Sequence, residues 1–222
     1  MKALRSLVVT LVVCVSMISL TSCVAPSHKQ TPYSVTAFRP KNPAAVEVKV
    51  SLSKQIVYVT EGDRLLMAAA TCVGLPGKAT PEGRFHISNK IAEKRSNSYG
   101  YFVNGGAISP GEAAKPQPGR FVGYPMAYWC EFSPAYGFHA GYVHPVPRTH
   151  GCLRLHKTVA PKFFALVREG TPVHIAQSLP EDLKYSAQVA HPTDYQDPDP
   201  PAEFMISAKV FEKPDAAHLL EP

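Results

Sequence analysis

Apolar and polar residues alternate over residues 45–56, and this is the clearest pattern in the chain. The apolar positions of the segment are Val46, Val48, Val50 and Leu52. Successive side chains of a strand point to opposite faces, so the alternation predicts a half-buried strand. Runs rich in β-branched and aromatic residues predict further strands at 55–60, 64–73, 84–88, 99–103, 126–132, 136–139 and 171–176. The pattern therefore predicts a mainly β fold.

Residues 158–169 have the spacing of a helix, with their apolar side chains close to one face. Thr158 is suited to cap the N-terminus, and Pro161 falls in the first turn, where its missing N–H is tolerated. Gly170 is suited to end the helix. We expect this segment to be the one main packed helix of the fold.

Three segments lack a regular pattern. Residues 23–44 are polar and Pro-rich, which predicts an extended tether. Residues 104–125 hold many Gly and Pro residues, and two interpretations stay open, a lid over a site and a disordered insertion. Residues 178–222 are rich in Pro and acidic residues, which predicts a mostly irregular tail. The folded domain is therefore expected at residues 45–177, flanked by irregular tails.

The first residues have the composition of a targeting segment. A short basic region precedes an apolar run at residues 7–20, which is too short to span a bilayer comfortably. Small residues then stand directly before Cys23, which resembles the lipobox of bacterial lipoproteins, whose cysteine is lipidated. The alternative is an ordinary secretory signal with an incidental cysteine. We expect a lipoprotein signal peptide at residues 1–22. Because Val24 is not Asp, the resemblance implies a lipid anchor at the periplasmic face of the outer membrane.

The charge balance of the chain is modest. The sequence has 23 basic and 17 acidic side chains, which give a formal net charge of +6. No concentrated stripe of Lys and Arg accompanies this charge, so nucleic-acid binding is not indicated. A mild positive charge suits an anionic polymer such as a cell wall, although charge alone is weak evidence for one.

The number of cysteines bears on their reactivity. The five cysteines are Cys14, Cys23, Cys72, Cys130 and Cys152. Loss of the signal peptide and lipidation of Cys23 leave three, so at least one thiol of the exported chain is free or reactive. Cys72 and Cys130 are expected either to be buried small side chains or to form a disulfide, which export permits.

Residues 138–156 hold the side chains best suited to chemistry. They are Cys152 and the histidines His139, His144, His150 and His156. One use is nucleophilic catalysis, in which an imidazole takes the thiol proton and a third group fixes the imidazole tautomer. The other use is metal binding, for which the spacing is irregular and matches no familiar zinc pattern. His156 is expected at the surface, just before the helix.

A family resemblance favours the first chemistry. Thr-His-Gly-Cys-Leu-Arg-Leu at residues 149–155 resembles the Ser/Thr-His-Gly-Cys-aliphatic-Arg motif of L,D-transpeptidase (YkuD-type) catalytic domains. His-Ala-Gly at 139–141 is similar to the family's upstream His-x-Gly. Residues 80–87 and 170–173 resemble its Thr-Pro-x-Gly-x-Phe-x-Ile and Gly-Thr-x-Val segments. The motifs cover roughly residues 45–176 in the family's order, and the resemblance implies the family's β-sandwich.

The resemblance also implies roles for individual residues. Cys152 matches the nucleophile and His139 the general base. The carbonyl of Ala140 would orient His139, because a ring N–H needs only an acceptor. Gly151 and the Cys152 N–H would form part of the oxyanion hole.

Further positions match the family more loosely. Tyr128 corresponds to an aromatic near the oxyanion hole, and His150 would shape the pocket. Arg154 has two open interpretations, a contact to a substrate carboxylate and a brace of its strand. Two departures are Ala140, where Gly is common, and His144, where Pro is common; neither changes the implied chemistry.

The reaction follows from the resemblance alone. Cys152 would attack a peptidoglycan tetrapeptide stem, release D-Ala and form a thioester. The acceptor can be an amine of a second stem, giving a 3→3 crosslink, an amine of an envelope protein, or water, which would make the enzyme an L,D-carboxypeptidase. No metal or organic cofactor is implied. The alternatives are that hydrolase, a non-catalytic peptidoglycan-binding lipoprotein, and a cysteine peptidase, whose usual motifs residues 138–155 do not resemble.

Overall fold

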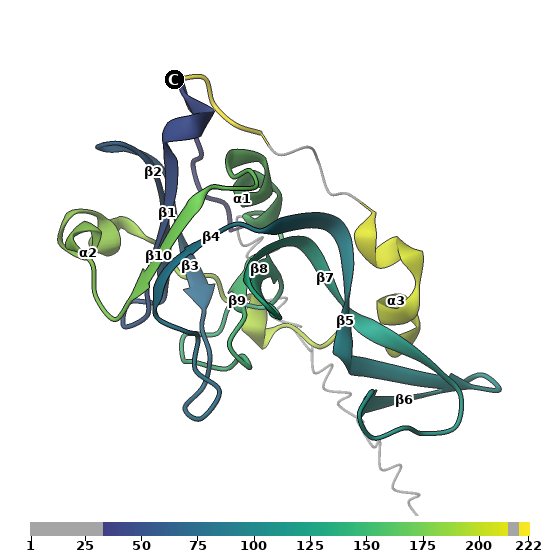
Figure 1. Ribbon diagram of the computed structural model, residues 1–222. Coiled ribbons are helices and arrows are strands. Elements are labelled where there is room, and N and C mark those ends of the chain that lie inside the picture. The colour runs from purple at the N-terminus through teal and green to yellow at the C-terminus, as the bar shows by residue number, and fades with distance from the viewer. Residues whose placement is uncertain (1–32, 213–217) are drawn as a thin grey trace, which may run out of the picture. The chain divides into compact units, whose positions relative to one another are not determined.

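Ten strands form one continuous mixed sheet within residues 33–212 and 218–222, the part of the chain that the computed structural model describes (Figure 1). The strands are β1 (Val46–Ser51), β2 (Ile56–Glu61), β3 (Arg64–Cys72), β4 (Gly83–His86), β5 (Asn89–Asn104), β6 (Ala107–Glu112), β7 (Arg120–Ser133), β8 (Tyr136–Ala140), β9 (Leu153–Leu155) and β10 (Pro172–Ala176). Their order across the sheet is β4-β10-β1-β2-β3-β9-β8-β7-β5-β6. The short strand β9 therefore joins the two halves of the sheet.

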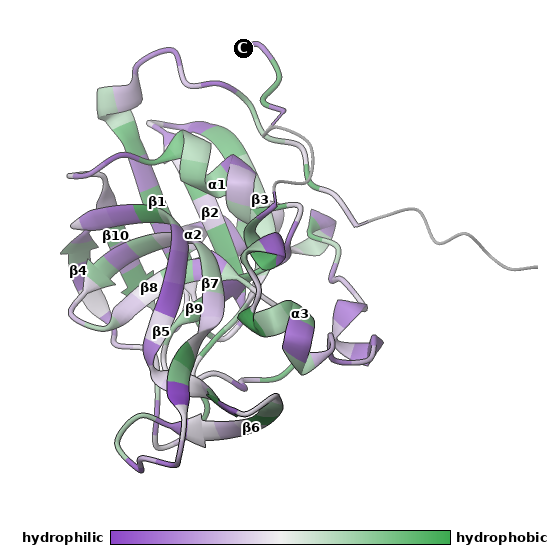
Figure 2. Ribbon diagram, turned by 90° about the vertical axis from the view of Figure 1, so that its right-hand side faces the viewer, coloured by the Kyte–Doolittle hydropathy of each residue, from purple (hydrophilic) through white to green (hydrophobic). Residues whose placement is uncertain are grey.

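The alternation at the start of the domain forms the predicted strand. Val46, Val48 and Val50 are buried, whereas Glu47 is exposed. Strand β1 pairs antiparallel with β2 and parallel with β10, so chain segments far apart in sequence complete this half of the sheet. In Figure 2, where residues are coloured by hydropathy, much of the polar strand β5 is purple.

The sheet folds back on itself around one apolar core. Strands β4 and β7 are distant in the strand order, yet the rings of Phe85 and Phe132 lie 5.3 Å apart. The Ser88 N–H donates to the Glu131 carbonyl at 2.8 Å beside them. Buried side chains from both halves and from the main helix form a single cluster between the layers. This closure confirms the predicted β-sandwich.

The main packed helix is α1 (Ala160–Leu166), which is shorter than the predicted segment 158–169. Pro161 lies in its first turn, as predicted, and Phe163 packs on Phe138 with ring centroids 4.5 Å apart. The prediction that Thr158 caps the helix is wrong. Its hydroxyl instead donates to the Tyr33 carbonyl at 2.7 Å and so ties the N-terminal segment to the domain.

The prediction of a long loop at residues 104–125 is wrong, because most of these residues lie in strands β6 and β7. Strand β6 and the beginning of β7 pair antiparallel with the far end of β5 and form a projecting arm. Glycine composition misled the prediction here. A Cβ at Gly123 would overlap the backbone carbonyl of Ser96. This glycine therefore permits the close approach of the paired strands β5 and β7 and does not mark a loop.

The segments on either side of the sandwich are also more ordered than predicted. Residues 33–39, part of the expected tether, pack on β3: Ala37 is buried, and the Phe38 N–H donates to the Leu66 carbonyl at 2.9 Å. The Leu220 N–H donates to the Ala37 carbonyl at 2.8 Å, so the two ends of the described chain meet. The predicted signal peptide at residues 1–22 and the lipidation site Cys23 lie outside the described residues.

The predicted irregular tail is wrong for the residues that directly follow the sheet. Helices α2 (Pro180–Tyr185) and α3 (Ala202–Ile206) form there, joined by short 3-10 turns. The buried carboxylate of Asp182 anchors α2, because it accepts hydrogen bonds from the Ser51 and Tyr58 hydroxyls at 2.8 Å each and from the Leu179 N–H at 3.0 Å. Residues 33–222 accordingly form one compact unit.

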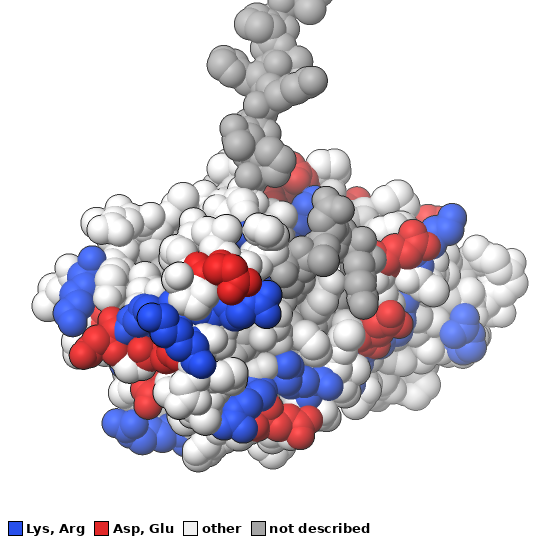
Figure 3. Space-filling model, turned by 90° about the horizontal axis from the view of Figure 1, so that it is seen from above, with Lys and Arg blue, Asp and Glu red and all other residues white. Residues whose placement is uncertain are grey.

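The surface carries charges of both signs. On the face shown in Figure 3, basic and acidic side chains are interspersed, and no single-sign patch dominates. None of the helices within the described residues combines the length and the apolar composition that a membrane crossing needs.

The anchor at Asp182 gives a stability prediction. Asp182→Ala leaves the buried hydroxyls of Ser51 and Tyr58 without their acceptor, so we expect it to lower the free energy of unfolding by about 3 kcal/mol. Urea titration of the purified chain measures this value. Asp197→Ala, at an exposed position, is the matched control and should change it little. An unchanged midpoint for Asp182→Ala would show that the tail does not stabilise the sandwich.

Candidate active site

The imidazole of His139 lies on strand β8, and the thiol of Cys152 lies just before the neighbouring strand β9. Strands β8 and β9 are parallel, with His139 in register with Arg154. Cys152 directly precedes β9, two residues before Arg154, so strand alternation places all three side chains on one face. The opposite face carries Phe138 and packs on α1. The residues assigned from the sequence as base and nucleophile therefore lie on and beside two paired strands, and their side chains share one face of the sheet.

One peptide group orients the His139 ring. Its Nδ1 lies 2.8 Å from the Ala140 carbonyl oxygen, and because a carbonyl only accepts, Nδ1 carries the proton. The N–H at the other end of the same peptide belongs to Gly141 and donates to the Leu155 carbonyl at 2.9 Å. The sheet therefore fixes the peptide plane, the plane fixes the tautomer, and Nε2 is left with a free lone pair.

The environment keeps His139 neutral. Burial lowers the pKa of His139 to about 4; the bond to Ala140 opposes this shift, and the charge of Arg154 adds to it. The indole of Trp129 covers the ring, with centroids 6.2 Å apart. A neutral imidazole with a free Nε2 can accept a proton throughout the neutral range.

The thiol of Cys152 is free and partly exposed. Burial raises the pKa of Cys152 above its ordinary value, although the Gly137 N–H and the Arg154 charge act in the opposite direction. Its Sγ lies 3.6 Å from the Ala135 carbonyl oxygen, and within the described residues no hydrogen bond joins it to the His139 ring. Without substrate, the thiol of Cys152 and the imidazole of His139 are therefore both neutral. The thiol must lose its proton before the sulfur can attack.

Two threonines hold the turn that presents the thiol. The Thr149 hydroxyl donates to the Cys152 carbonyl at 2.6 Å and accepts from the Gly151 N–H at 3.1 Å. The Thr80 hydroxyl donates to the Gly151 carbonyl at 2.9 Å. Gly151 has a φ of +110°, and a Cβ there would overlap the Tyr136 ring. Neither threonine was assigned a role from the sequence, although Thr80 begins the segment 80–87 and Thr149 the segment 149–155, both of which resemble family motifs.

These bonds change the expected oxyanion hole. The Gly151 N–H is already paired with Thr149, so it is not available to a substrate oxygen. The Cys152 N–H makes no hydrogen bond within residues 33–212 and 218–222, which leaves this amide of the turn free. The Cys152 N–H is therefore available to an oxyanion, as expected. Gly151 instead allows the backbone of the turn to adopt a positive φ.

Tyr128 does not lie where sequence analysis expected it. Its ring packs on Phe164 of α1, with centroids 5.7 Å apart, on the face opposite His139. The adjacent residue, Trp129, lies over the site instead. Neighbouring residues of a strand point to opposite faces, so only the register could tell which aromatic of the pair faces the thiol.

The other expected residues lie around the rim. His150 is exposed, and its ring meets Tyr99 of β5 edge-on at 4.9 Å. The stem of Arg154 runs beside Gly141, and its guanidinium makes no hydrogen bond or ion pair with any described residue. Arg154 is therefore free to meet an anionic group in the open part of the site.

The histidines do not gather as metal ligands. Each ring has its own aromatic neighbour: His139–Trp129, His144–Tyr195, His150–Tyr99 and His156–Tyr33. The part of the chain that the structure describes holds no group of three metal-ligating side chains. His156 is buried, contrary to the prediction of a surface position. Cys72 and Cys130 are buried and unpaired, so the disulfide left open by the sequence does not form.

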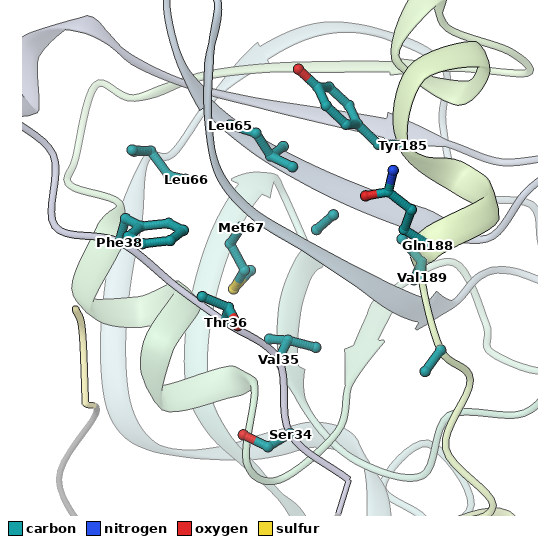
Figure 4. A pocket seen from close by; sticks show the side chains of 12 residues that line it. Ser34, Val35, Thr36, Phe38, Leu65, Leu66, Met67, Tyr185, Gln188 and Val189 are labelled. Atoms are coloured by element: carbon teal, nitrogen blue, oxygen red, sulfur yellow. The ribbon is translucent and has the colours of Figure 1, made fainter. Parts of the chain in front are cut away.

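A cavity of about 330 Å³ lies elsewhere, between the N-terminal segment, β3 and the turn after α2 (Figure 4). Its walls include Phe38, Leu65 and Tyr185. None of the residues that line it belongs to β8, β9 or the turn before Cys152, so this cavity is separate from the thiol.

One family model matches more than half of the chain. Residues 45–175 match the family model of the L,D-transpeptidase catalytic domain, YkuD. No curated protein sequence matches the chain. Similar solved structures include an L,D-transpeptidase (Yku) from Stackebrandtia nassauensis, with 22% identity over 65% of this chain and 60% of that one and a TM-score of 0.46. Another is L,D-transpeptidase 1 of Mycobacterium tuberculosis, with 20% identity over 60% of this chain and 61% of that one and a TM-score of 0.43. The chain spans about three fifths of the length of both.

The neutral state of the thiol predicts how its reactivity depends on pH. Because burial raises the pKa of Cys152, less thiolate is present at any pH than in a free cysteine, and alkylation should keep rising above the ordinary value of 9.0. Iodoacetamide labelling followed over pH, with the adduct assigned by peptide mass, measures this profile. A midpoint below that ordinary value would indicate a preformed thiolate and contradict the neutral pair.

Proposed function

The chain belongs to the L,D-transpeptidase (YkuD) family, and on that premise we propose that it transfers acyl groups between peptidoglycan stem peptides through a thioester on Cys152. One observation carries the proposal. His139 lies on β8, which pairs with the strand that directly follows Cys152, and its ring is neutral, with Nδ1 bound to the Ala140 carbonyl and Nε2 free. This is the state that a general base for a neutral thiol requires.

In the first step, His139 Nε2 takes the thiol proton and Sγ of Cys152 attacks the amide carbon between the third residue of a tetrapeptide stem and its terminal D-Ala. The carbonyl oxygen becomes an oxyanion, and the free Cys152 N–H can donate to it. Because burial disfavours the charged imidazole, the proton taken up is readily given away.

In the second step, the C–N bond breaks and His139 donates its proton to the departing amine of D-Ala. The stem remains attached to Cys152 as a thioester. An acceptor amine then attacks the thioester carbon, its proton passes to His139, and the sulfur leaves and recovers that proton. Atoms and charges balance at each step, and no cofactor takes part.

The acceptor determines the product. An amine of a second stem gives a 3→3 crosslink, and an amine of an envelope protein attaches that protein to the wall. Water instead of an amine gives a shortened stem, the L,D-carboxypeptidase reaction. Analysis of the products from purified muropeptides separates these three outcomes.

We further propose that Arg154 binds a carboxylate of the stem peptide. Its guanidinium is half-buried on the site face and has no partner among the described residues. A guanidinium presents paired donors that match a carboxylate, and the stem carries carboxylates near the scissile amide.

The location of the enzyme is also a proposal. We propose that Cys23 carries a lipid that anchors the chain at the periplasmic face of the outer membrane, where peptidoglycan is within reach. The support is the sequence at residues 20–23, with small residues directly before the cysteine. The mass of the mature N-terminal peptide tests this: we expect a lipidated Cys23 as the first residue, and an unmodified N-terminus would contradict the anchor.

Intact-mass analysis tests the donor half of the reaction. Incubation with a disaccharide-tetrapeptide should add to Cys152 the mass of the disaccharide-tripeptide less one water, the acyl group of the thioester, and release D-Ala. Cys152→Ala should form no adduct. His139→Gln should slow adduct formation by a factor of about 10²–10⁴, the usual contribution of a general base.

The matched control for the base is His86→Gln, since His86 is an exposed histidine on β4. It should leave the rate unchanged. Absence of D-Ala release from the folded wild-type protein, or an adduct on Cys152→Ala, would overturn the proposal.

A further inference from the structure

A segment outside the matched family region lies against the site. The match ends at residue 175, whereas residues 189–201, here called the C-terminal strap, contact residues that follow β8 and β9. Val189 packs on the cluster of Ala70, Cys72 and Val143. The Tyr142 hydroxyl donates to the Pro198 carbonyl at 3.1 Å. The strap therefore touches the residues that directly follow β8.

These residues belong to the chain that connects base and nucleophile. Residues 141–149, here called the connecting loop, lead from His139 on β8 to the turn before Cys152. The loop is held at its start by the bond from the Gly141 N–H to Leu155. It is held near its end by the Arg148 and Thr149 N–H groups, which donate to the Val73 carbonyl at 2.9 and 3.0 Å.

Asp194 of the strap holds the loop between these two anchors. Its Oδ1 accepts from the Val143 N–H at 3.3 Å, and Val143 is buried. Its Oδ2 lies 3.8 Å from Nε2 of His156, the residue that directly follows β9. The side chain of Asp194 is only 9% exposed. Its two oxygens face the connecting loop on one side and the residue that follows β9 on the other.

His156 is itself fixed in place. Its Nδ1 lies 2.8 Å from the Thr158 hydroxyl oxygen, and its ring meets Tyr33 edge-on at 5.0 Å. Asp194 therefore contacts both the backbone of the connecting loop and a buried imidazole that directly follows β9.

We propose that Asp194 is a positioning residue for the reaction at Cys152. By accepting from Val143 while it faces His156, it fixes the connecting loop against the end of β9 and so fixes the spacing between the His139 imidazole and the Cys152 thiol. Without the carboxylate, the Val143 N–H is buried and unpaired, and the loop must shift to reach another acceptor. Small displacements of this kind strongly slow reactions between positioned groups. The inference rests on the proposed function for the identity of the reaction.

Single-turnover kinetics of thioester formation with the disaccharide-tetrapeptide tests the role. Asp194→Ala should lower the maximal rate by a factor of about 10² while half-saturation changes little, because the strap acts on the reacting pair. Asp194→Asn should restore most of the rate, since its amide oxygen can still accept from Val143. Asp197→Ala, at an exposed position of the same strap, is the matched control and should behave as wild type.

Two outcomes would overturn the proposal. One is a wild-type maximal rate in folded Asp194→Ala, and the other is an equal loss in Asp194→Asn and Asp194→Ala. A thermal melt of each variant establishes the folded fraction used to normalise the rates. If Asp194→Ala does not fold, Asp194→Leu, which is similar in size but has no acceptor, replaces it in the comparison.

A second measurement is independent of peptidoglycan. The rate of iodoacetamide labelling of Cys152, followed over pH, reports whether the His139 imidazole still accepts the proton of the thiol. Asp194→Ala should shift this profile toward that of His139→Gln, and an unshifted profile would contradict the positioning role. If the wild-type protein releases no D-Ala, the proposed function fails, while this comparison still decides the role of Asp194.

Discussion

The peptide plane between Ala140 and Gly141 is the constraint on which the site depends. Its N–H is bound by the sheet and its carbonyl is bound by an imidazole, so a backbone ladder directly determines the tautomer of a side chain. No side chain of Ala140 is needed for this, which explains why a position commonly occupied by glycine in the family tolerates alanine. A carboxylate in the same role would place a charge beside the buried ring. The carbonyl orients the ring, and burial still keeps the imidazole neutral.

Most strands could be predicted from the sequence, and so could the turn before Cys152, because both follow from local pattern. The alternation of Val46 to Val50 reports burial directly, and the glycine before Cys152 reports a turn with positive φ. The choice between Tyr128 and Trp129 depends on which face of β7 meets β8, and this is a property of the register between strands. The bond from Thr149 that occupies the Gly151 N–H was equally invisible, because it depends on how the turn closes.

Composition was the least reliable guide. Gly and Pro in residues 104–125 suggested a loop, but glycines such as Gly123 permit the close approach of the paired strands β5 and β7. Acidic residues and prolines suggested an irregular tail after residue 178. A single buried carboxylate there, that of Asp182, accepts three hydrogen bonds and holds the segment on the sheet. A census of polar residues does not distinguish solvated carboxylates from buried ones, and only the latter determine structure.

The way the N-terminal segment joins the domain has a mechanical consequence. Tyr33 is tied to Thr158, and Val35 to Lys162, by bonds of 2.7 and 2.6 Å, while Phe38 is bound to β3. Tension applied to the chain ahead of Tyr33 is therefore transmitted as shear into α1 and β3. Both elements border the site, since β3 pairs with β9 and Phe163 of α1 packs on Phe138 of β8. A pull on this end of the domain is therefore passed to the immediate neighbours of the two strands that frame the imidazole and the sulfur.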